Sequence, residues 1–214
     1  MAGQPWQFLL LPWVVALLMT FEPARLDLLY REVPEQFWIT GSKVGIAVSL
    51  ITYLRFYSPL SLAIYYGLSL VGAGAVGLAS ILGLMGEGDF LATLAIALTV
   101  PAPFPGGLLP PIYLVIVVAS AAELLTRALI SYRMCRSLRC LGGAEVPCSR
   151  LVRDLRWWFP AGSDLTTEVP SEAALRACQG DGDKVKAQPG LPYVTFILLA
   201  LPVAVALSAI LRVP

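Results

Sequence analysis

Two aspartates at the ends of apolar stretches are the residues of this chain best placed to do chemistry. Asp27 follows the first apolar stretch, and Asp89 closes the Gly-Glu-Gly-Asp sequence of residues 86–89, between two further apolar stretches. A charged side chain costs about 2.5–3.5 kcal/mol at the centre of a membrane helix on insertion scales, so an acid in such a place is a functional candidate. Each also has a simpler interpretation. Asp27 would be a solvated anchor beside Arg25 and Arg31, and Asp89 would cap the helix that follows it.

Two carboxyl groups within hydrogen-bond reach of each other can hydrolyse a peptide bond. They cannot both ionise cheaply, so they share one proton, and one acts as a base while the other acts as an acid. The base deprotonates a water molecule that attacks the peptide carbonyl, and the acid protonates the carbonyl oxygen. The pair therefore predicts aspartyl protease chemistry with Asp27 and Asp89 as catalytic residues, and with no cofactor and no metal.

The composition predicts the protein class that must position these acids. Apolar residues make up 57% of the 214 residues and charged residues only 14%, and the mean hydropathy is +0.76. These values lie far from those of soluble domains and indicate an integral membrane protein. A net charge of +1 gives no reason to expect a nucleic-acid partner.

Apolar stretches of suitable length predict an all-α, polytopic fold with six transmembrane helices. They cover residues 6–20, 37–54, 59–85, 90–100, 108–130 and 191–211. We expect five helices in residues 1–130, a cytoplasmic segment at 131–188, and the sixth helix in 189–214. The acids lie where the helices meet polar loops, so their placement depends on where each helix ends.

The distribution of basic residues predicts the orientation. Of the 15 Lys and Arg residues, only Arg55 and Arg212 fall outside the loops on one face of the predicted bundle. Basic residues concentrate in cytoplasmic loops. We therefore expect a multi-pass protein of the cell membrane, with the amino terminus outside and both aspartates near the cytoplasmic surface.

Three motifs resemble those of a known family. Residues 27–34 read Asp-Leu-Leu-Tyr-Arg-Glu-Val-Pro, residues 86–89 read Gly-Glu-Gly-Asp, and residues 189–193 read Pro-Gly-Leu-Pro-Tyr. In this order and with this number of spans, the chain resembles the GxGD intramembrane aspartyl proteases, and among them the archaeal preflagellin peptidase branch of the type IV prepilin peptidases. Besides the two aspartates, the resemblance assigns these motif residues to the site: Gly86, Glu87, Gly88, Arg31, Pro34, Pro189, Gly190 and Pro192.

The resemblance implies an endopeptidase that removes the leader of archaellin or type IV pilin precursors at the cytoplasmic membrane face. Its partners would be the lipid bilayer and membrane-embedded precursors with a leader that is basic and then apolar. Four acids near the predicted site are candidates to attract the basic part, with solvated loop charges as the alternative: Glu22, Glu32, Glu35 and Glu87.

The chain departs from bacterial members of the family in two places. Those carry a Lys two residues after the second aspartate and a paired-cysteine zinc segment in the first cytoplasmic loop. Here residue 91 is Leu, and residues 22–36 contain no Cys. We therefore expect peptidase activity without N-methylation of the new amino terminus.

The polar segment contains a second Gly-x-Gly-Asp sequence, at residues 180–183. It lies among polar residues, which favours a solvated turn that leads into a short extended segment. A helix is expected at 149–159, where arginines three apart and an apolar stripe indicate either an interfacial helix or one packed on the cytoplasmic end of the protein.

All four cysteines lie in the same segment: Cys135, Cys140, Cys148 and Cys178. Their spacing contains no tight pair, and without any His a zinc site would need all four thiolates. Because disulfides are usually disfavoured in the cytoplasm, we expect reduced thiols.

Two other classes of protein use or tolerate acids in such positions. A proton-coupled transporter would use the same acids as a relay, although no inverted repeat is evident in the chain. A non-catalytic membrane scaffold would need neither acid.

Overall fold

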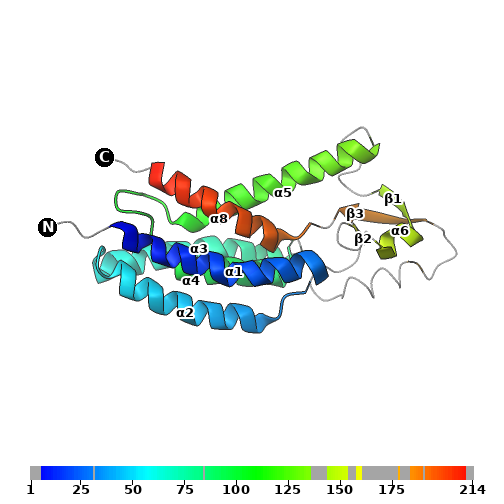
Figure 1. The fold of residues 1–214 in the computed structure, drawn as a ribbon. Helices are drawn as coiled ribbons and strands as arrows, with labels where there is room; N and C mark the ends of the chain where they lie inside the picture. Colours follow the sequence, from blue (N-terminus) through cyan, green and yellow to red (C-terminus); the bar gives the residue numbers. More distant parts are fainter. Residues whose placement is uncertain are drawn as a thin grey trace.

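The computed structural model consists of a helical bundle with a small β-sheet beyond one end (Figure 1). It describes residues 6–30, 32–83, 85–135, 144–153, 158–160, 178, 184–189 and 191–210. The helices are η1 (Trp6–Leu9), α1 (Leu10–Tyr30), α2 (Glu35–Tyr53), α3 (Pro59–Ile81), α4 (Glu87–Thr99), α5 (Pro111–Cys135), α6 (Cys148–Arg153) and α8 (Tyr193–Ile210). The strands are β1 (Ala144–Pro147), β2 (Trp158–Pro160) and β3 (Lys184–Pro189).

Four helices in the described part are long and apolar enough to cross a membrane. They are Gln7–Tyr30, Pro59–Ile81, Pro111–Arg133 and Tyr193–Ile210. The six predicted spans are therefore not confirmed. Helix α4 has 13 residues, which at 1.5 Å per residue gives about 20 Å against a hydrocarbon core of about 30 Å. Helix α2 is long enough but less apolar, with Glu35 and Lys43 among its residues.

Helix α1 is longer than the sequence predicted. The prediction ended it at residue 20 and placed Asp27 in a polar loop, but the helix continues to Tyr30. Glu22 and Arg25 are polar, yet they form an ion pair at 2.7 Å on the helix surface, where residues three apart are neighbours. Asp27 is consequently part of a helix, and the connection to α2 is short.

Helix α4 lies at the centre of the bundle and contacts α1, α2, α3, α5 and α8. Its buried residues are small or β-branched apolar and hydroxyl side chains: Ala92, Thr93, Ala95, Ile96, Ala97 and Thr99. Small residues allow helix backbones to approach closely, which is how helices associate in membranes. The central position explains how a short helix is held with its first turn, and hence Asp89, at one end of the bundle.

The polar segment folds in part into a three-stranded antiparallel sheet in the order β1-β3-β2. The all-α prediction therefore does not hold for this segment. Val146 of β1 pairs with Val185 of β3, and it forms a small core with Leu151 and Ala187. Strand β3 confirms the extended segment predicted after the second Gly-x-Gly-Asp sequence, which itself lies outside the described residues.

The helix predicted at 149–159 is only partly present. Helix α6 ends at Arg153, and residues 158–160 form strand β2 instead. Pairing with β3 overrides the helical pattern there, because Trp158 and Phe159 take positions opposite Pro189 and Gln188 in the sheet.

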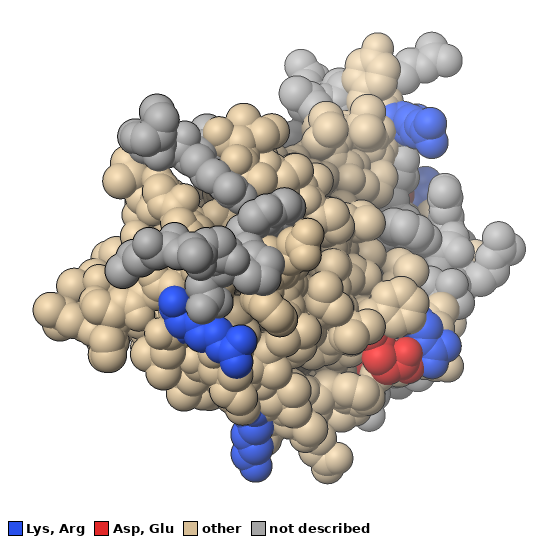
Figure 2. Space-filling model, turned by 60° about the vertical axis from the view of Figure 1, so that its left-hand side comes forward, with Lys and Arg blue, Asp and Glu red and all other residues tan. Residues whose placement is uncertain are grey.

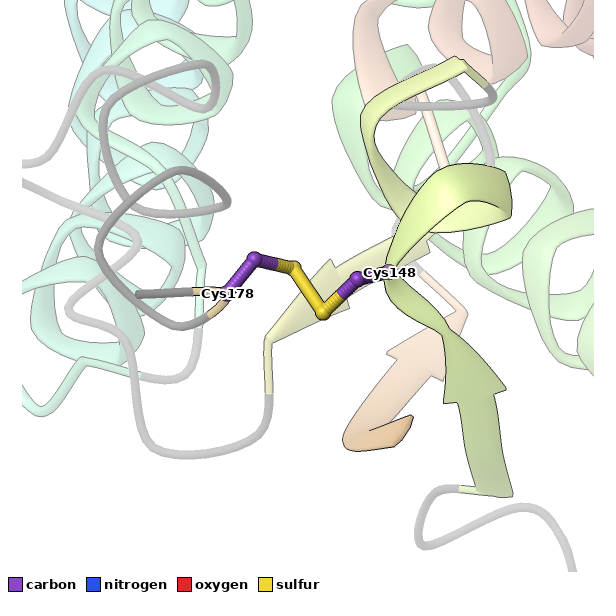
Figure 3. The surroundings of a disulfide bond; sticks show 2 residues. All are labelled: Cys148 and Cys178. Carbon is purple, nitrogen blue, oxygen red and sulfur yellow. A yellow bond between two sulfur atoms is a disulfide. The ribbon is translucent and has the colours of Figure 1, made fainter. Parts of the chain in front are cut away.

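The expectation of reduced thiols is wrong for Cys148 and Cys178, which form a disulfide (Figure 3). Their Cα atoms lie 5.7 Å apart, although 30 positions separate them in the sequence. The bond ties the start of α6 to the chain that leads into β3, where Cys178 packs against the small core of the sheet.

The surface of the bundle carries few charges. Figure 2 shows one face whose described surface is mostly uncharged, with a few separate basic side chains and an acidic group beside one of them. Large apolar side chains are exposed on α3 and α5, among them Val71, Leu78, Val117 and Leu124. Such a surface fits a protein embedded in lipid. The number of crossings and their direction remain predictions.

Candidate functional site

Asp27 is buried against the N-terminus of α8. Its side chain is 9% exposed, and its Oδ2 accepts a hydrogen bond from the backbone N–H of Val194 at 3.1 Å. The first backbone N–H groups of a helix have no acceptor within the helix, and they form the positive end of its dipole. A carboxylate placed there satisfies one of these donors and is stabilised in its charged form. The solvated-anchor interpretation of Asp27 is therefore wrong.

A second contact holds α1 against α8 at the same place. The Thr195 hydroxyl donates to the Ala24 carbonyl oxygen at 3.1 Å. Ala24 precedes Asp27 by nearly one helical turn, and Thr195 follows Val194 directly. The two bonds together fix which face of α1 meets the first turn of α8, so the position of Asp27 does not depend on its own bond alone.

Asp89 lies in the first turn of α4. Its Oδ2 accepts a hydrogen bond from the backbone N–H of Gly86 at 3.1 Å. Gly86 has no side chain to bond in return, so only one arm of a capping box is present. Asp89 therefore takes part in capping, but from the third position of the helix, because the N-cap residue is Gly86.

Tyr193 lies close to the second acid. Its hydroxyl is 3.0 Å from Ser120 Oγ on α5, the residue is buried, and the Asp89 charge is near enough to act on its phenol. Asp27 is bonded to Val194, and the Asp89 charge acts at longer range on the phenol of the preceding residue, Tyr193. Since α1, α4 and α8 also contact one another, the structure brings both aspartates to the same end of the bundle.

The polar segment joins the bundle at this same end. Strand β3 ends at Pro189, four positions before α8 begins with Tyr193. The sheet in Figure 1 accordingly lies beyond the end of α1 and the start of α8. The candidate site is therefore at the junction between the apolar bundle and the polar part of the chain.

Helix α5 contributes an ion pair, Glu123–Arg127, that was not among the predicted site residues. Arg127 donates to Glu123 Oε1 at 2.6 Å, and both side chains are partly buried within a helix that is apolar enough to cross a membrane. The charge of Glu123 also acts on the Tyr193 phenol. In the sequence, this pair could have been recognised as two opposite charges four positions apart within an apolar stretch. Ser120 and Tyr193 have no comparable sequence pattern that marks them as site residues.

The two motif glycines do not pack against another element. A Cβ on Gly88 would meet nothing within 4 Å, and one on Gly86 would meet only Asp89 at ordinary contact distance. Neither has a positive φ. The backbone of Gly88, directly before Asp89, therefore borders open space.

The remaining predicted site residues are spread over several elements. Pro34 is the N-cap residue of α2, Glu87 is exposed at the start of α4, and Pro192 is buried directly before α8. Pro189 is the last residue of β3. Arg31 and Gly190 lie outside the described residues.

Among the residues that the structure describes, no group of three or more His, Cys, Asp or Glu side chains is placed to hold a metal ion. A metal-free mechanism remains a prediction that rests on the carboxyl pair.

No family model, curated protein or solved structure matches the chain. The resemblance to the prepilin peptidases therefore rests on the three motifs, and the function that it implies remains a proposal.

Proposed function

We propose that this protein is a membrane aspartyl endopeptidase that cleaves the leader of archaellin or type IV pilin precursors at the cytoplasmic membrane face. The observation that carries the proposal is that two carboxylates from different helices lie at the same end of the bundle, beside the start of α8. Asp27 adjoins Val194, and the charge of Asp89 acts on Tyr193. The helices α1, α4 and α8 are far apart along the chain, so only the fold brings these residues to the same end of the bundle.

The N-terminus of α8 supports a shared proton between the two acids. Its backbone N–H groups favour negative charge next to Asp27, while repulsion between two nearby carboxylates disfavours a second negative charge. Once substrate binding brings the two carboxyls within hydrogen-bond reach, one proton on the pair is the state that this balance favours. In that state, the ionised acid takes a proton from water and the protonated acid donates to the carbonyl oxygen of the peptide. The roles then reverse as the amine leaves.

The surroundings of Asp89 support access by a substrate chain. The space beside Gly88 is open, and Glu87 is exposed at the start of α4. A precursor helix in the membrane, with its leader extending into the aqueous phase, would present its cleavage point at this depth. The substrate class itself rests on the motif resemblance.

The test is cleavage of a precursor leader by the purified protein and by the variants Asp27→Asn and Asp89→Asn. Asparagine retains a side-chain oxygen that can accept the bonds from Val194 and Gly86, so these two bonds are preserved while the charge is lost. We expect each change to lower kcat by about 10²–10⁴-fold.

Asp181→Asn and Asp183→Asn in the second Gly-x-Gly-Asp sequence serve as controls and should leave turnover close to that of the wild type. Inactive loop variants beside an active Asp89→Asn would show that the wrong motif was assigned. Ion flux in vesicles without any peptidase activity would favour the transporter instead.

The dependence of activity on pH provides a second readout in the same assay. Activity should fall at low pH when the second proton binds, and at high pH when the shared proton leaves, so the profile should be a bell whose limits belong to the pair. Metal chelators should have no effect. A profile with a single limb would contradict the shared proton.

A further inference from the structure

An open hollow of about 530 Å³ lies where α1 ends and α2 begins. It is lined by Leu26, Tyr30, Glu32, Val33, Pro34 and Glu35. Its volume is within the range of sites that bind small molecules or a few side chains. Leu26 directly precedes Asp27, so the hollow adjoins the helix turn that carries the first candidate catalytic acid.

The hollow combines apolar and acidic side chains. Leu26 and Val33 are half-buried, whereas Glu32 and Glu35 are exposed. A side chain with an apolar stem and a cationic head matches this combination, because Lys and Arg place their stems along apolar surface and keep the charge in water.

Ion pairing and position distinguish between the four acids that are candidates to attract the basic part of the leader, which are Glu22, Glu32, Glu35 and Glu87. Glu22 is paired with Arg25 at 2.7 Å, so its charge is already offset. The other ion pair is Glu123–Arg127, so neither Glu32 nor Glu35 is paired with a described cation. Only Glu32 and Glu35 also line the hollow, and they are the charged residues among its described lining.

We propose that this hollow is the subsite that binds the basic part of the precursor leader, with the cationic heads beside Glu32 and Glu35 and their stems against Leu26 and Val33. The proposal rests on the peptidase function proposed above. A chain segment held here lies next to the turn of α1 that carries Asp27. The hollow would thereby determine which peptide bond reaches the two aspartates, and would select leaders by charge.

The test exchanges charges between the protein and the substrate. The double variant E32K/E35K and the wild type are assayed on two precursors, one with a basic leader and one in which its Lys and Arg are replaced by Glu. For the basic leader, we expect the variant to lose about tenfold in kcat/KM, mostly through KM, because exposed charge pairs contribute little individually. For the acidic leader, we expect the variant to cleave faster than the wild type.

Glu145→Lys is the matched control, since Glu145 is an exposed acid on β1 outside the hollow. It should leave the preference between leaders unchanged. The neutral variant E32Q/E35Q covers the case in which the charge reversal fails to fold, and it should cleave both leaders with similar kcat/KM.

Two results would overturn the proposal, and they are distinguishable. If the wild type cleaves a leader but the Lys and Gln variants keep its preference, the hollow is not the subsite and the peptidase function stands. If the wild type cleaves neither precursor, the peptidase function itself fails and the subsite fails with it.

Discussion

Asp27 is a buried acid whose position depends on another helix. Burial of a carboxylate is costly unless it is hydrogen-bonded, and here Val194 supplies a backbone donor at the positive end of α8. The residue before α8 is Pro192, whose side chain cannot cap the helix. The Asp27 carboxylate provides the missing acceptor for the Val194 N–H at this N-terminus. The acid and the helix start thus stabilise each other, which explains how an acid can persist in an apolar bundle.

Tyr193→Phe is predicted to act on both stability and turnover. The change removes a hydroxyl that is 3.0 Å from Ser120 Oγ and near the Asp89 charge. The lost bond should lower the free energy of unfolding by about 1 kcal/mol, as measured by denaturation in detergent. If the phenol also orients Asp89, kcat should fall while KM stays the same.

Ser120→Ala is the matched control for Tyr193→Phe, because it removes the same hydrogen bond and leaves the phenol in place. It should reproduce the stability loss with a smaller effect on kcat. Equal losses of kcat in both variants would show that the hydroxyl pair has a packing role only.

The helices of the bundle meet closely where small residues face each other. Gly45 of α2 lies against Thr99 of α4, so that a Cβ on Gly45 would overlap the Thr99 hydroxyl. That hydroxyl is held by a bond of 2.7 Å to the Ala95 carbonyl oxygen and has little freedom to move away. Close packing at this point helps to hold the short α4 in the centre of the bundle.

Gly45→Ala is predicted to destabilise the protein by about 1–3 kcal/mol, because an added methyl group in a packed interface forces neighbouring atoms to shift. Thermal unfolding in detergent measures the effect. Gly74→Ala is the control, since a Cβ there would meet nothing within 4 Å and Ala is the better helix former. Equal loss of stability in both variants would contradict the packing argument.

The molecule as a whole combines an apolar bundle with a small sheet that has its own core. Val146, Leu151 and Ala187 form that core, and the Cys148–Cys178 disulfide adjoins it. A sheet of this size buries little apolar surface, so a covalent link contributes a large share of its stability. The bundle holds its own larger core.

Replacing Cys148 and Cys178 together by Ser is predicted to loosen the sheet while the bundle stays folded. For a loop of about 30 residues, the lost constraint on the unfolded chain corresponds to about 3–4 kcal/mol. Limited proteolysis should cut the variant faster between residues 144 and 189, and the wild type under reducing conditions should behave in the same way. An unchanged cleavage rate would show that the disulfide does not stabilise the sheet.

The sequence alone determined the features that depend on local composition. Apolar stretches longer than about 18 residues predicted α3, α5 and α8 nearly to their ends, because hydropathy and helical propensity act on neighbouring residues. The motifs likewise singled out Asp27 and Asp89 without any structure. The extent of α1 was underestimated, because Glu22 and Arg25 are polar and resemble loop residues in the sequence, while their ion pair is seen only in the structure.

Only the tertiary structure decided which distant residues meet. Asp27 and Val194 are 167 positions apart, and no pattern in either segment indicates that one will accept a bond from the other. The same holds for Tyr193 with Ser120 and for Cys148 with Cys178. Hydropathy encodes that a helix is buried in an apolar environment but not which helix lies beside it. That choice depends on side-chain packing across the whole bundle.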